Sequence, residues 1–321
     1  MFQNKNVLVT GGAGMTGHEV VAQLLERGAH VRATVFNNPT LPHRTLKIDH
    51  NHLEIFPCDL IDNEQCKNAL KDIDIVVNCL ALICGAKGQT DTPLSLIRNN
   101  LVPYINIIES ACIAGVEKFA FISSSTMYPE SEFPVTEDEA FLADPAECYF
   151  GFGWMKRYCE KLCENFHKNT KTKFALIRTG SIYGPHDIFD IDKSHVIPSL
   201  ILKAHRKDDP FEVWGDGNQK RDCIHVSQLV DGLLTVLDKH AVVDPINIAS
   251  GQSYSVNEIT SVILNKYGYK PEKRYILSKP TMVLARYINI DKAKKILGWT
   301  NKVSLEEGIN NTVDWYEQNV V

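Results

Sequence analysis

The sequence predicts an α/β fold in which a doubly wound parallel sheet is followed by a smaller α/β lobe toward the C-terminal end. Short β-branched runs alternate with apolar patterns of helical period up to residue 182. This alternation is typical of a parallel sheet covered by helices. A glycine cluster at residues 11–17 separates the first strand-like run from the first helical pattern. From residue 183 the rhythm breaks into loops and shorter elements, which suits a second lobe that holds a substrate.

Each element of the predicted sheet follows from its local pattern. Strands are expected at residues 7–10, 30–36, 53–57, 73–80, 118–123 and 174–178. Helices are expected at residues 18–25, 63–71, 99–114 and 149–168. Ligands of such sheets bind beyond the carboxyl ends of the strands. We therefore expect a sheet domain of residues 1–182, to which 223–249 return, and a substrate lobe of residues 183–222 and 250–321.

Composition excludes several classes of protein. A chain of 321 residues, 44% of them hydrophobic, can bury a large core. The net charge is -5 and no basic block is present, so nucleic acid is not an expected partner. No apolar run reaches the roughly 20 residues that a membrane span requires, and the first strand begins too early for a signal peptide. The nine cysteines lack a Cys-x-x-Cys pair, which indicates a reduced, cytoplasmic setting and no metal site.

The glycine cluster has the spacing of a Gly-x-x-Gly-x-x-Gly loop. Gly11 lets the chain turn sharply, Gly14 lets the backbone approach a diphosphate, and Gly17 lets the helix pack closely on the strand. The helix that starts there presents free N–H groups and a partial positive charge, which stabilise a diphosphate. Because the loop lies between a strand and a helix, we expect it to bind a dinucleotide rather than to form a purely structural turn.

The end of the second strand bears on the choice between NAD and NADP. An NAD site usually has an acidic residue there, which holds the 2′-hydroxyl of the ribose. In this chain the position falls on Val35 and no carboxylate follows directly, so the sequence favours NADP, with NAD as the alternative. Arg32 and Arg44 are candidates to reach the 2′-phosphate, although Arg32 could equally be a solvated strand residue. Asp59, after the third strand, is either an acceptor for the adenine amino group or a turn residue.

Several motifs in this order resemble the extended short-chain dehydrogenase/reductases. They are Thr10 to Gly17, Asn78-Cys79-Leu80-Ala81, Ser124 with Tyr128-Pro129, and the helix that carries Lys156. Residues 178–185 add a resemblance to the NAD(P)-dependent nucleotide-sugar epimerases and dehydratases of that superfamily. The resemblance implies a Rossmann fold, hydride transfer with a nicotinamide cofactor and a nucleotide-diphosphate sugar substrate. It assigns cofactor contacts to Met15, Thr16, Leu60, Leu80, Ala81, Asn100 and Lys156. For Asn100, capping of a helix or strand end is the alternative.

The catalytic pair of this superfamily is a tyrosine and a lysine four residues apart on one helix face. The lysine matches Lys156, but the tyrosine position holds Phe152. Phenylalanine has no hydroxyl, so the usual proton transfer by a tyrosine of lowered pKa is absent from this chain. The resemblance gives Ser124 the role of hydrogen-bond partner to the sugar oxygen at the reacting carbon.

Two explanations for Phe152 are open. A Tyr→Phe replacement introduced to trap substrate without turnover would leave every surrounding motif intact, as is the case in this sequence. Alternatively, the natural protein has lost this step or has rerouted it, for example through Tyr149.

Further motifs resemble the GDP-L-fucose synthases, which are NADPH-dependent epimerases and reductases. These motifs are residues 183–189, 194–198, 214–217, 221–226, 279–281 and 297–299. In that family a histidine before Val-Ile-Pro acts as an acid in epimerisation, and it matches His195, which taken alone would suit a structural histidine. The matching base is a cysteine, whereas this chain has Thr126, a poor base. The sequence therefore supports hydride transfer at C4 better than it supports double epimerisation.

The same resemblance assigns substrate contacts to Ser181, His195, Val196, Trp214, Arg221 and Arg286. Arg221 suits a diphosphate because a guanidinium donates two parallel hydrogen bonds, and its alternative is an ion pair with Asp222 or Asp231. Trp214 either lines the base pocket or packs in a turn. Arg286 aligns with a lysine of the family and keeps its positive charge.

The sequence thus predicts an NADP-linked nucleotide-sugar oxidoreductase that transfers hydride at C4 of a hexose or heptose, favouring one carried on GDP. One alternative is an epimerase or 4,6-dehydratase with tightly bound NAD, which the lack of an acid at Val35 disfavours. Another is a non-catalytic protein that senses a dinucleotide, which Phe152 favours. As in relatives, the helices at 99–114 and 149–168 could form the interface of a homodimer.

Overall fold

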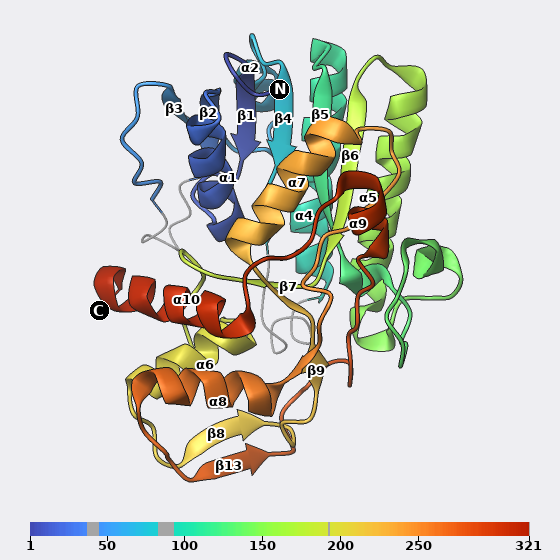
Figure 1. The fold of residues 1–321 in the computed structure, drawn as a ribbon. Helices are drawn as coiled ribbons and strands as arrows, with labels where there is room; N and C mark the ends of the chain where they lie inside the picture. Colours follow the sequence, from blue (N-terminus) through green and yellow to red (C-terminus); the bar gives the residue numbers. More distant parts are fainter. Residues whose placement is uncertain (37–44, 83–92, 192, 321) are drawn as a thin grey trace.

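The computed structural model describes residues 1–36, 45–82, 93–191 and 193–320, and its centre is a seven-stranded parallel sheet (Figure 1). The strands are β1 (Asn6–Thr10), β2 (His30–Val35), β3 (Leu53–Pro57), β4 (Ile75–Asn78), β5 (Lys118–Ser124), β6 (Lys173–Thr179) and β11 (Ile246–Asn247). Their order is β3-β2-β1-β4-β5-β6-β11, so the winding reverses between β1 and β4. This is the order of a doubly wound Rossmann sheet with one added edge strand, and it confirms the predicted fold class.

Helices cover both faces of the sheet because successive strand residues point to opposite faces. Val7 and Val9 pack in the core on one face, whereas Leu8 between them packs in the core on the other. The first face is covered by α1 (Met15–Glu26) and α7 (Val226–Lys239), and the second by α2 (Asn63–Ala69), α4 (Pro93–Ala114) and α5 (Phe150–Asn169).

A smaller lobe lies beyond the carboxyl ends of the strands (Figure 1). It contains α6 (Val196–His205), α8 (Val256–Tyr267) and α10 (Leu305–Asn319), which share a separate hydrophobic core. Its strands form a parallel pair, β8 (Phe211–Trp214) with β13 (Lys273–Ile276), and an antiparallel pair, β9 (Lys220–Arg221) with β12 (Tyr254–Ser255). A further parallel pair, β7 (Ser181–Tyr183) with β10 (Cys223–His225), lies where the chain passes between the sheet and the lobe.

Most predicted elements are present, and the differences lie at their ends. The strand expected at 73–80 is limited to β4, because the Leu80 N–H donates to the Thr10 hydroxyl (3.2 Å) rather than to a neighbouring strand. Helix α4 begins at Pro93, before residue 99, since a first helical position needs no N–H donor. The 3-10 turns η1 (Ser125–Met127), η2 (Glu137–Phe141) and η3 (Glu147–Tyr149) precede α5, which therefore begins at Phe150.

Residues 291–299 return to the sheet. Helix α9 (Asp291–Leu297) and Trp299 contribute to the same core as α7, and the Trp299 indole N–H donates to Asp231 (3.1 Å). This stretch therefore packs against the sheet, although the segments before and after it in the sequence belong to the lobe. The domain boundaries given by the sequence stay a prediction.

A buried polar network fixes α5 on the sheet. Arg178 at the end of β6 donates to both carboxylate oxygens of Glu160 on α5 (3.0 and 2.7 Å), and both side chains are about 3% exposed. Arg178 also donates to the hydroxyl of Tyr128 (3.2 Å), which in turn donates to Asn247 on β11 (2.6 Å). Loss of one partner of such a pair leaves an uncompensated charge, which typically costs about 3–5 kcal/mol. The network therefore couples α5, β6 and the loop after β5.

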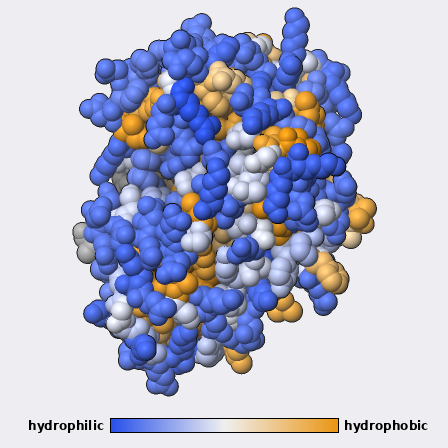
Figure 2. All heavy atoms as spheres, viewed as in Figure 1, coloured by the Kyte–Doolittle hydropathy of each residue, from blue (hydrophilic) through white to orange (hydrophobic). Residues whose placement is uncertain are grey.

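Hydrophilic residues cover most of the face seen in Figure 2, with smaller hydrophobic patches between them. Among the helices that the structure describes, none combines the length and the apolar character that crossing a membrane requires.

Candidate active site

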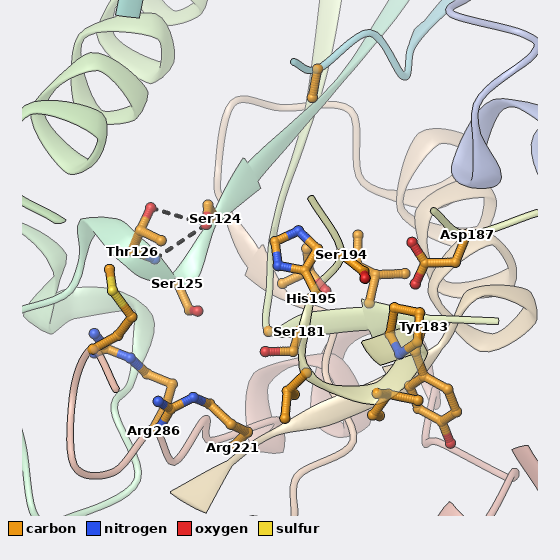
Figure 3. Close-up of a pocket in the computed structure, with 18 of the residues that line it drawn as sticks. Ser124, Ser125, Thr126, Ser181, Tyr183, Asp187, Ser194, His195, Arg221 and Arg286 are labelled. Carbon is orange, nitrogen blue, oxygen red and sulfur yellow. Dashed lines mark hydrogen bonds between the residues drawn. The ribbon is translucent and has the colours of Figure 1, made fainter. Parts of the chain in front are cut away.

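A cavity of about 380 Å³ lies between the carboxyl edge of the sheet and the smaller lobe, and Figure 3 shows its central part. One side is formed by the loop before α1, the ends of β4 and β5, and the first turns of α5. The other side is formed by β7, the start of α6, the end of β8 and residues 280–286. The cavity thus lies where ligands of doubly wound sheets bind.

The structure brings most of the candidate site residues to this cavity. Those that line it are Gly14, Met15, Thr16, Leu80, Ala81, Ser124, Thr126, Phe152, Lys156, Ser181, His195, Val196, Trp214, Arg221 and Arg286. Those that do not are Gly11, Gly17, Arg32, Asp59, Leu60 and Asn100. Arg44 lies outside the described residues.

The glycine loop has the geometry that a diphosphate requires. Gly11 has a φ of +65°, and a Cβ on Gly17 would lie 2.1 Å from the Gly11 carbonyl oxygen, so the two glycines allow the turn and the close packing behind it. Thr34 holds the loop by accepting hydrogen bonds from Gly11 N–H at its hydroxyl (3.2 Å) and from Gly12 N–H at its carbonyl (2.9 Å). Helix α1 has no side-chain cap and no acidic residue in its first turn. Its first N–H groups are therefore available to an anion, which fits the pyrophosphate of a dinucleotide.

Residues 80–82 form one edge of the cavity, which we call the rim; some of the other cofactor candidates belong to it and one lies behind it. Leu80 and Ala81 line the cavity, next to Asn78, which accepts a hydrogen bond from Thr10 (2.6 Å). Asn100 is fully buried and lies behind them, where its side chain bonds to both the N–H and the carbonyl of Leu82 (2.8 and 2.9 Å). The structure thus shows Asn100 as a support of the rim rather than as a residue that faces the cavity.

Arg32 does not reach the cofactor side, which contradicts the expectation that it meets a 2′-phosphate. Its guanidinium pairs with Glu54 (2.7 Å) and donates to the carbonyls of Ala69 and Lys71 (3.0 and 2.9 Å) at the end of α2. These groups precede β4, so they lie at the amino edge of the sheet, opposite the cavity.

Of the two cofactor candidates after β3, Asp59 takes the turn role, which was one of its two expected alternatives, and Leu60 lies away from the cavity. Asp59 accepts a hydrogen bond from the N–H of Ile61 (3.0 Å) and donates its own N–H to Gln65 (2.8 Å), which is the turn role. Leu60 is 3% exposed and packs in the core beside α4. Neither side chain lines the cavity.

Lys156 is a buried cation at the cavity wall. Its ammonium donates to the Ile122 carbonyl (2.9 Å) and to the Tyr104 hydroxyl (3.2 Å), and the side chain is 4% exposed. The rings of Tyr104, Phe121 and Phe152 lie 4.7, 4.9 and 5.8 Å from its nitrogen, measured to their centroids. Burial lowers the pKa of Lys156 to about 8, and the negative charge of Glu160 partly opposes this shift.

Phe152 lies one turn before Lys156 and presents a ring, without a hydroxyl, to the cavity. Tyr149, a further turn back, also lines the cavity. Burial raises the pKa of Tyr149, and the guanidinium groups of Arg221 and Arg286 oppose this rise.

Ser124 and Thr126 form a hydroxyl pair at the end of β5 (Figure 3). The Ser124 oxygen accepts hydrogen bonds from the Thr126 N–H (3.2 Å) and from the Thr126 hydroxyl (3.0 Å), so Ser124 caps the turn η1. With its oxygen accepting both, the O–H of Ser124 remains available as a donor toward the cavity.

His195 occupies the N-cap position of α6 without a side-chain capping hydrogen bond, and it lines the cavity with Ser181 (Figure 3) and with Val196. Burial lowers the pKa of His195, which favours its neutral form. Trp214, at the end of β8, lines the cavity with the Lys279 ammonium 5.1 Å from its ring centroid.

Two arginines from the lobe face the same space. Arg221 donates to the carbonyls of Lys220 and Val283 (both 2.8 Å) and of Thr281. The alternative ion pair of Arg221 with Asp222 or Asp231 is not formed, since Asp222 accepts from Ser250 and Gly251 and Asp231 pairs with Arg27.

Arg286 is the more deeply buried of the two, at 5% exposure. Its Nη1 donates to the Pro129 carbonyl (3.0 Å), whereas its Nη2 has no hydrogen-bond partner within the described residues. A buried guanidinium nitrogen without an acceptor suits an anionic ligand.

Several polar residues at this site were not among the sequence candidates, and three of them make informative contacts. Tyr104 contacts Lys156 from α4, Lys203 on α6 lines the cavity and donates to the Glu212 carbonyl (2.8 Å), and the buried Thr179 hydroxyl at the end of β6 has no partner among the described residues. The only local signal was the spacing of Tyr104, one helical turn after Asn100.

The lowered pKa of Lys156 predicts a pH-dependent stability. Because its pKa is lower in the folded chain than in an unfolded one, the buried ammonium destabilises the fold at neutral pH, and this cost fades as the pH rises from about 8 to 10.5. We expect the free energy of unfolding of the unmodified chain, minus that of Lys156→Met, to rise by about 2 kcal/mol between pH 7 and pH 10. Urea unfolding at several pH values measures this difference.

The control for this measurement is Lys161→Met, which removes an exposed lysine of the same helix. A difference between the unmodified chain and Lys156→Met that stayed constant from pH 7 to pH 10 would contradict a buried, titrating Lys156.

Comparisons with known proteins agree with this geometry. Residues 7–249 match the model of the NAD dependent epimerase/dehydratase family. The chain is 28% identical to a GDP-L-fucose synthase of Sinorhizobium fredii, over 100% of this chain and 98% of that protein. It is also 28% identical to a GDP-mannose 3,5-epimerase of Arabidopsis thaliana, over 99% of this chain and 84% of that protein.

Among solved structures, the UDP-glucuronic acid 4-epimerase of Bacillus cereus, in complex with UDP-glucuronic acid and NAD, is 26% identical with a TM-score of 0.84. The match covers 98% of this chain and 99% of that one. The family model spans most of the chain, and the glycine loop, the lysine on α5 and the cavity at the carboxyl edge occupy the expected places. The chain therefore belongs to the NAD-dependent epimerase/dehydratase family of nucleotide-sugar enzymes.

Proposed function

We propose that this protein binds NADP and a GDP-linked hexose or heptose and that its site is built for hydride transfer at C4 of the sugar. One observation carries the proposal. A single cavity joins the glycine loop, Ser124 and Lys156 of the sheet to Arg221 and Arg286 of the lobe. A dinucleotide on one side and a sugar diphosphate on the other would meet at Ser124 and Lys156.

The cofactor proposal rests on the loop and on the end of β2. The free N–H groups at the start of α1 suit the pyrophosphate, and bound NADPH supplies the hydride. NADP is proposed over NAD because neither Val35, which ends β2, nor Phe36 after it carries a carboxylate that would repel a 2′-phosphate. NAD is the competing outcome, and the Bacillus cereus neighbour is named with NAD.

The substrate proposal rests on the lobe. Arg221 and the Arg286 Nη2, which has no hydrogen-bond partner in the described part of the chain, suit a diphosphate. Trp214 offers a ring on which a base could stack. GDP is proposed because the relatives from Sinorhizobium fredii and Arabidopsis thaliana are named for GDP-sugars. Ser181, Val196 and His195 would line the sugar.

Around the sugar, each side chain has a distinct capacity. Ser124 can donate its O–H to the C4 oxygen, while Lys156 holds a positive charge beside it. Thr126 donates its hydroxyl to Ser124, and as a neutral alcohol it is poorly suited as a base for epimerisation. His195 lies on the opposite wall of the cavity, and in its neutral form it can accept or donate a proton there.

The first prediction of this proposal concerns the ligand. We expect isothermal titration to show that GDP-mannose binds more tightly than UDP-glucose or a dTDP-sugar. We also expect Arg286→Met to weaken the binding of all these sugar diphosphates by about tenfold, because one charged hydrogen bond is lost. Arg206→Met, on the outer side of the lobe, is the control. Tight binding of only UDP- or dTDP-sugars would refute the GDP assignment.

The second prediction concerns the hydroxyl missing at position 152. Phe152→Tyr places a phenol one turn from Lys156, beside an ammonium that stabilises its ionised form. General acid–base catalysis typically contributes about 10²–10⁴-fold, so we expect cofactor-dependent turnover of a 4-keto nucleotide sugar to rise by that order. The absorbance of NADPH at the nicotinamide band measures it.

The outcome of this substitution separates the alternatives. No turnover with any sugar nucleotide, in a variant that still binds the cofactor, would favour the non-catalytic sensor. Release of NAD from the denatured chain would favour the epimerase or 4,6-dehydratase with tightly bound NAD. The turnover measured for Phe152→Tyr separates these alternatives whether Phe152 is the natural residue or replaced a tyrosine.

We also propose a homodimer formed through α4 and α5. These helices pack side by side on the sheet and leave large apolar side chains exposed, namely Leu94, Ile113, Phe150, Trp154 and Tyr158. Two copies that pair these faces would bury them in a four-helix interface. The cytoplasmic location stays a prediction from the sequence.

Light scattering coupled to gel filtration tests the dimer. We expect twice the chain mass of 36.1 kDa for the unmodified chain and the monomer mass for Trp154→Glu. Leu284→Glu, an equally drastic change at an exposed position of the lobe, should leave the mass unchanged. A monomer for the unmodified chain at micromolar concentration would contradict the proposal.

A further inference from the structure

A buried chain of hydrogen bonds runs from Lys156 to the rim of the cavity. The Lys156 ammonium donates to the Tyr104 hydroxyl (3.2 Å), and that hydroxyl donates to the amide oxygen of Asn100 (3.3 Å). The same oxygen accepts the N–H of Leu82 (2.8 Å). Tyr104 is 1% exposed and Asn100 is 0% exposed, so the chain of bonds is shielded from water.

Two acceptors, the Ile122 carbonyl and the Tyr104 hydroxyl, set the orientation of the Lys156 ammonium. An ammonium has three N–H donors, and two of them are used by the Ile122 carbonyl and the Tyr104 hydroxyl. The ring centroids of Tyr104, Phe121 and Phe152 lie 4.7, 4.9 and 5.8 Å from the ammonium nitrogen, and no further protein acceptor bonds to it within the described residues. With those two acceptors in place, the third N–H is left for the cavity that Lys156 lines.

The other end of the chain of bonds holds the rim. The Asn100 amide nitrogen donates to the carbonyls of Leu82 (2.9 Å) and Leu96 (2.8 Å), while its oxygen accepts from Leu82. Leu82 therefore has both backbone groups fixed by one side chain, and it lines the same cavity. A single buried amide thus connects the rim segment to the hydroxyl that orients Lys156.

We infer that Tyr104 is a positioning residue, whose hydroxyl fixes the ammonium of Lys156 and couples it through Asn100 to the rim at Leu82. The inference rests on the proposed function only for the identity of the ligand that Lys156 meets. The contacts themselves belong to the protein alone. The effect acts through Lys156, since Tyr104 does not line the cavity.

The competing explanation is that Tyr104 serves only as a packed ring. Its ring meets Phe121 edge to face, with centroids 5.3 Å apart, in the core between α4 and the sheet. Tyr104→Phe keeps this packing and removes only the hydroxyl, so the variant is expected to fold. The matched control is Tyr128→Phe, which removes another buried tyrosine hydroxyl that bonds to Asn247 and Arg178.

The first measurement is the protonation midpoint of Lys156 in the protein without ligand. Competitive acetylation across a pH series, followed by mass spectrometry of the peptide that contains Lys156, reports it. Loss of an acceptor destabilises the charged ammonium, so in Tyr104→Phe we expect the midpoint to fall by roughly one pH unit from about 8. Tyr128→Phe should leave the midpoint where it is in the unmodified chain.

The second measurement is the binding of NADPH at pH 8, followed by the fluorescence of the nicotinamide. A midpoint one unit lower leaves about fivefold less of the protonated lysine at this pH, so we expect an affinity about fivefold weaker in Tyr104→Phe. At pH 6 both proteins carry a charged Lys156, and the difference should become small. A merely structural defect would weaken binding equally at both pH values.

The inference is overturned if the midpoint of Lys156 is the same in Tyr104→Phe and the unmodified chain, or if Tyr128→Phe lowers it equally. These results are distinguishable from failure of the proposed function. A shifted midpoint in a protein that binds no nicotinamide dinucleotide would uphold the role of Tyr104 and refute the assignment of the cofactor.

Discussion

Burial of a positive charge at the carboxyl edge of the sheet is the constraint on which the site depends. An ammonium in an apolar surrounding requires acceptors, and Lys156 finds them in the Ile122 carbonyl and the Tyr104 hydroxyl. Both partners come from elements other than α5, so the charge can be held only when β5, α4 and α5 are packed together. The buried Arg178–Glu160 pair, one turn further along α5, maintains that packing.

The two halves of the molecule contribute different chemistry to one space. The sheet side offers N–H groups at the start of α1 and the hydroxyl of Ser124, which suit a diphosphate and a sugar oxygen. The lobe side offers the guanidinium groups of Arg221 and Arg286, which are held by backbone carbonyls rather than by carboxylates. Among the described residues no carboxylate forms an ion pair with either guanidinium, so both suit an anionic ligand.

Phe152 replaces a hydroxyl by a plain ring at the cavity wall. Its ring keeps the apolar packing around Lys156, and the surrounding hydroxyls and cations are in place. What the position lacks is an oxygen that could carry a proton. The position that holds the tyrosine in the enzymes that this chain resembles therefore has no hydroxyl here, whereas Tyr149 is a tyrosine that does line the cavity.

The sequence by itself determined the local features: the alternation of strands and helices, the turn at Gly11 to Gly17, and the shared helix face of Phe152 and Lys156, because each depends on neighbours within a few residues. Only the tertiary structure decided what distant residues do. It turned Arg32 toward the amino edge of the sheet, against the expectation, and it placed Tyr104 against Lys156 across the boundary between two helices. Such pairings depend on how elements far apart in the chain pack, and no local pattern encodes them.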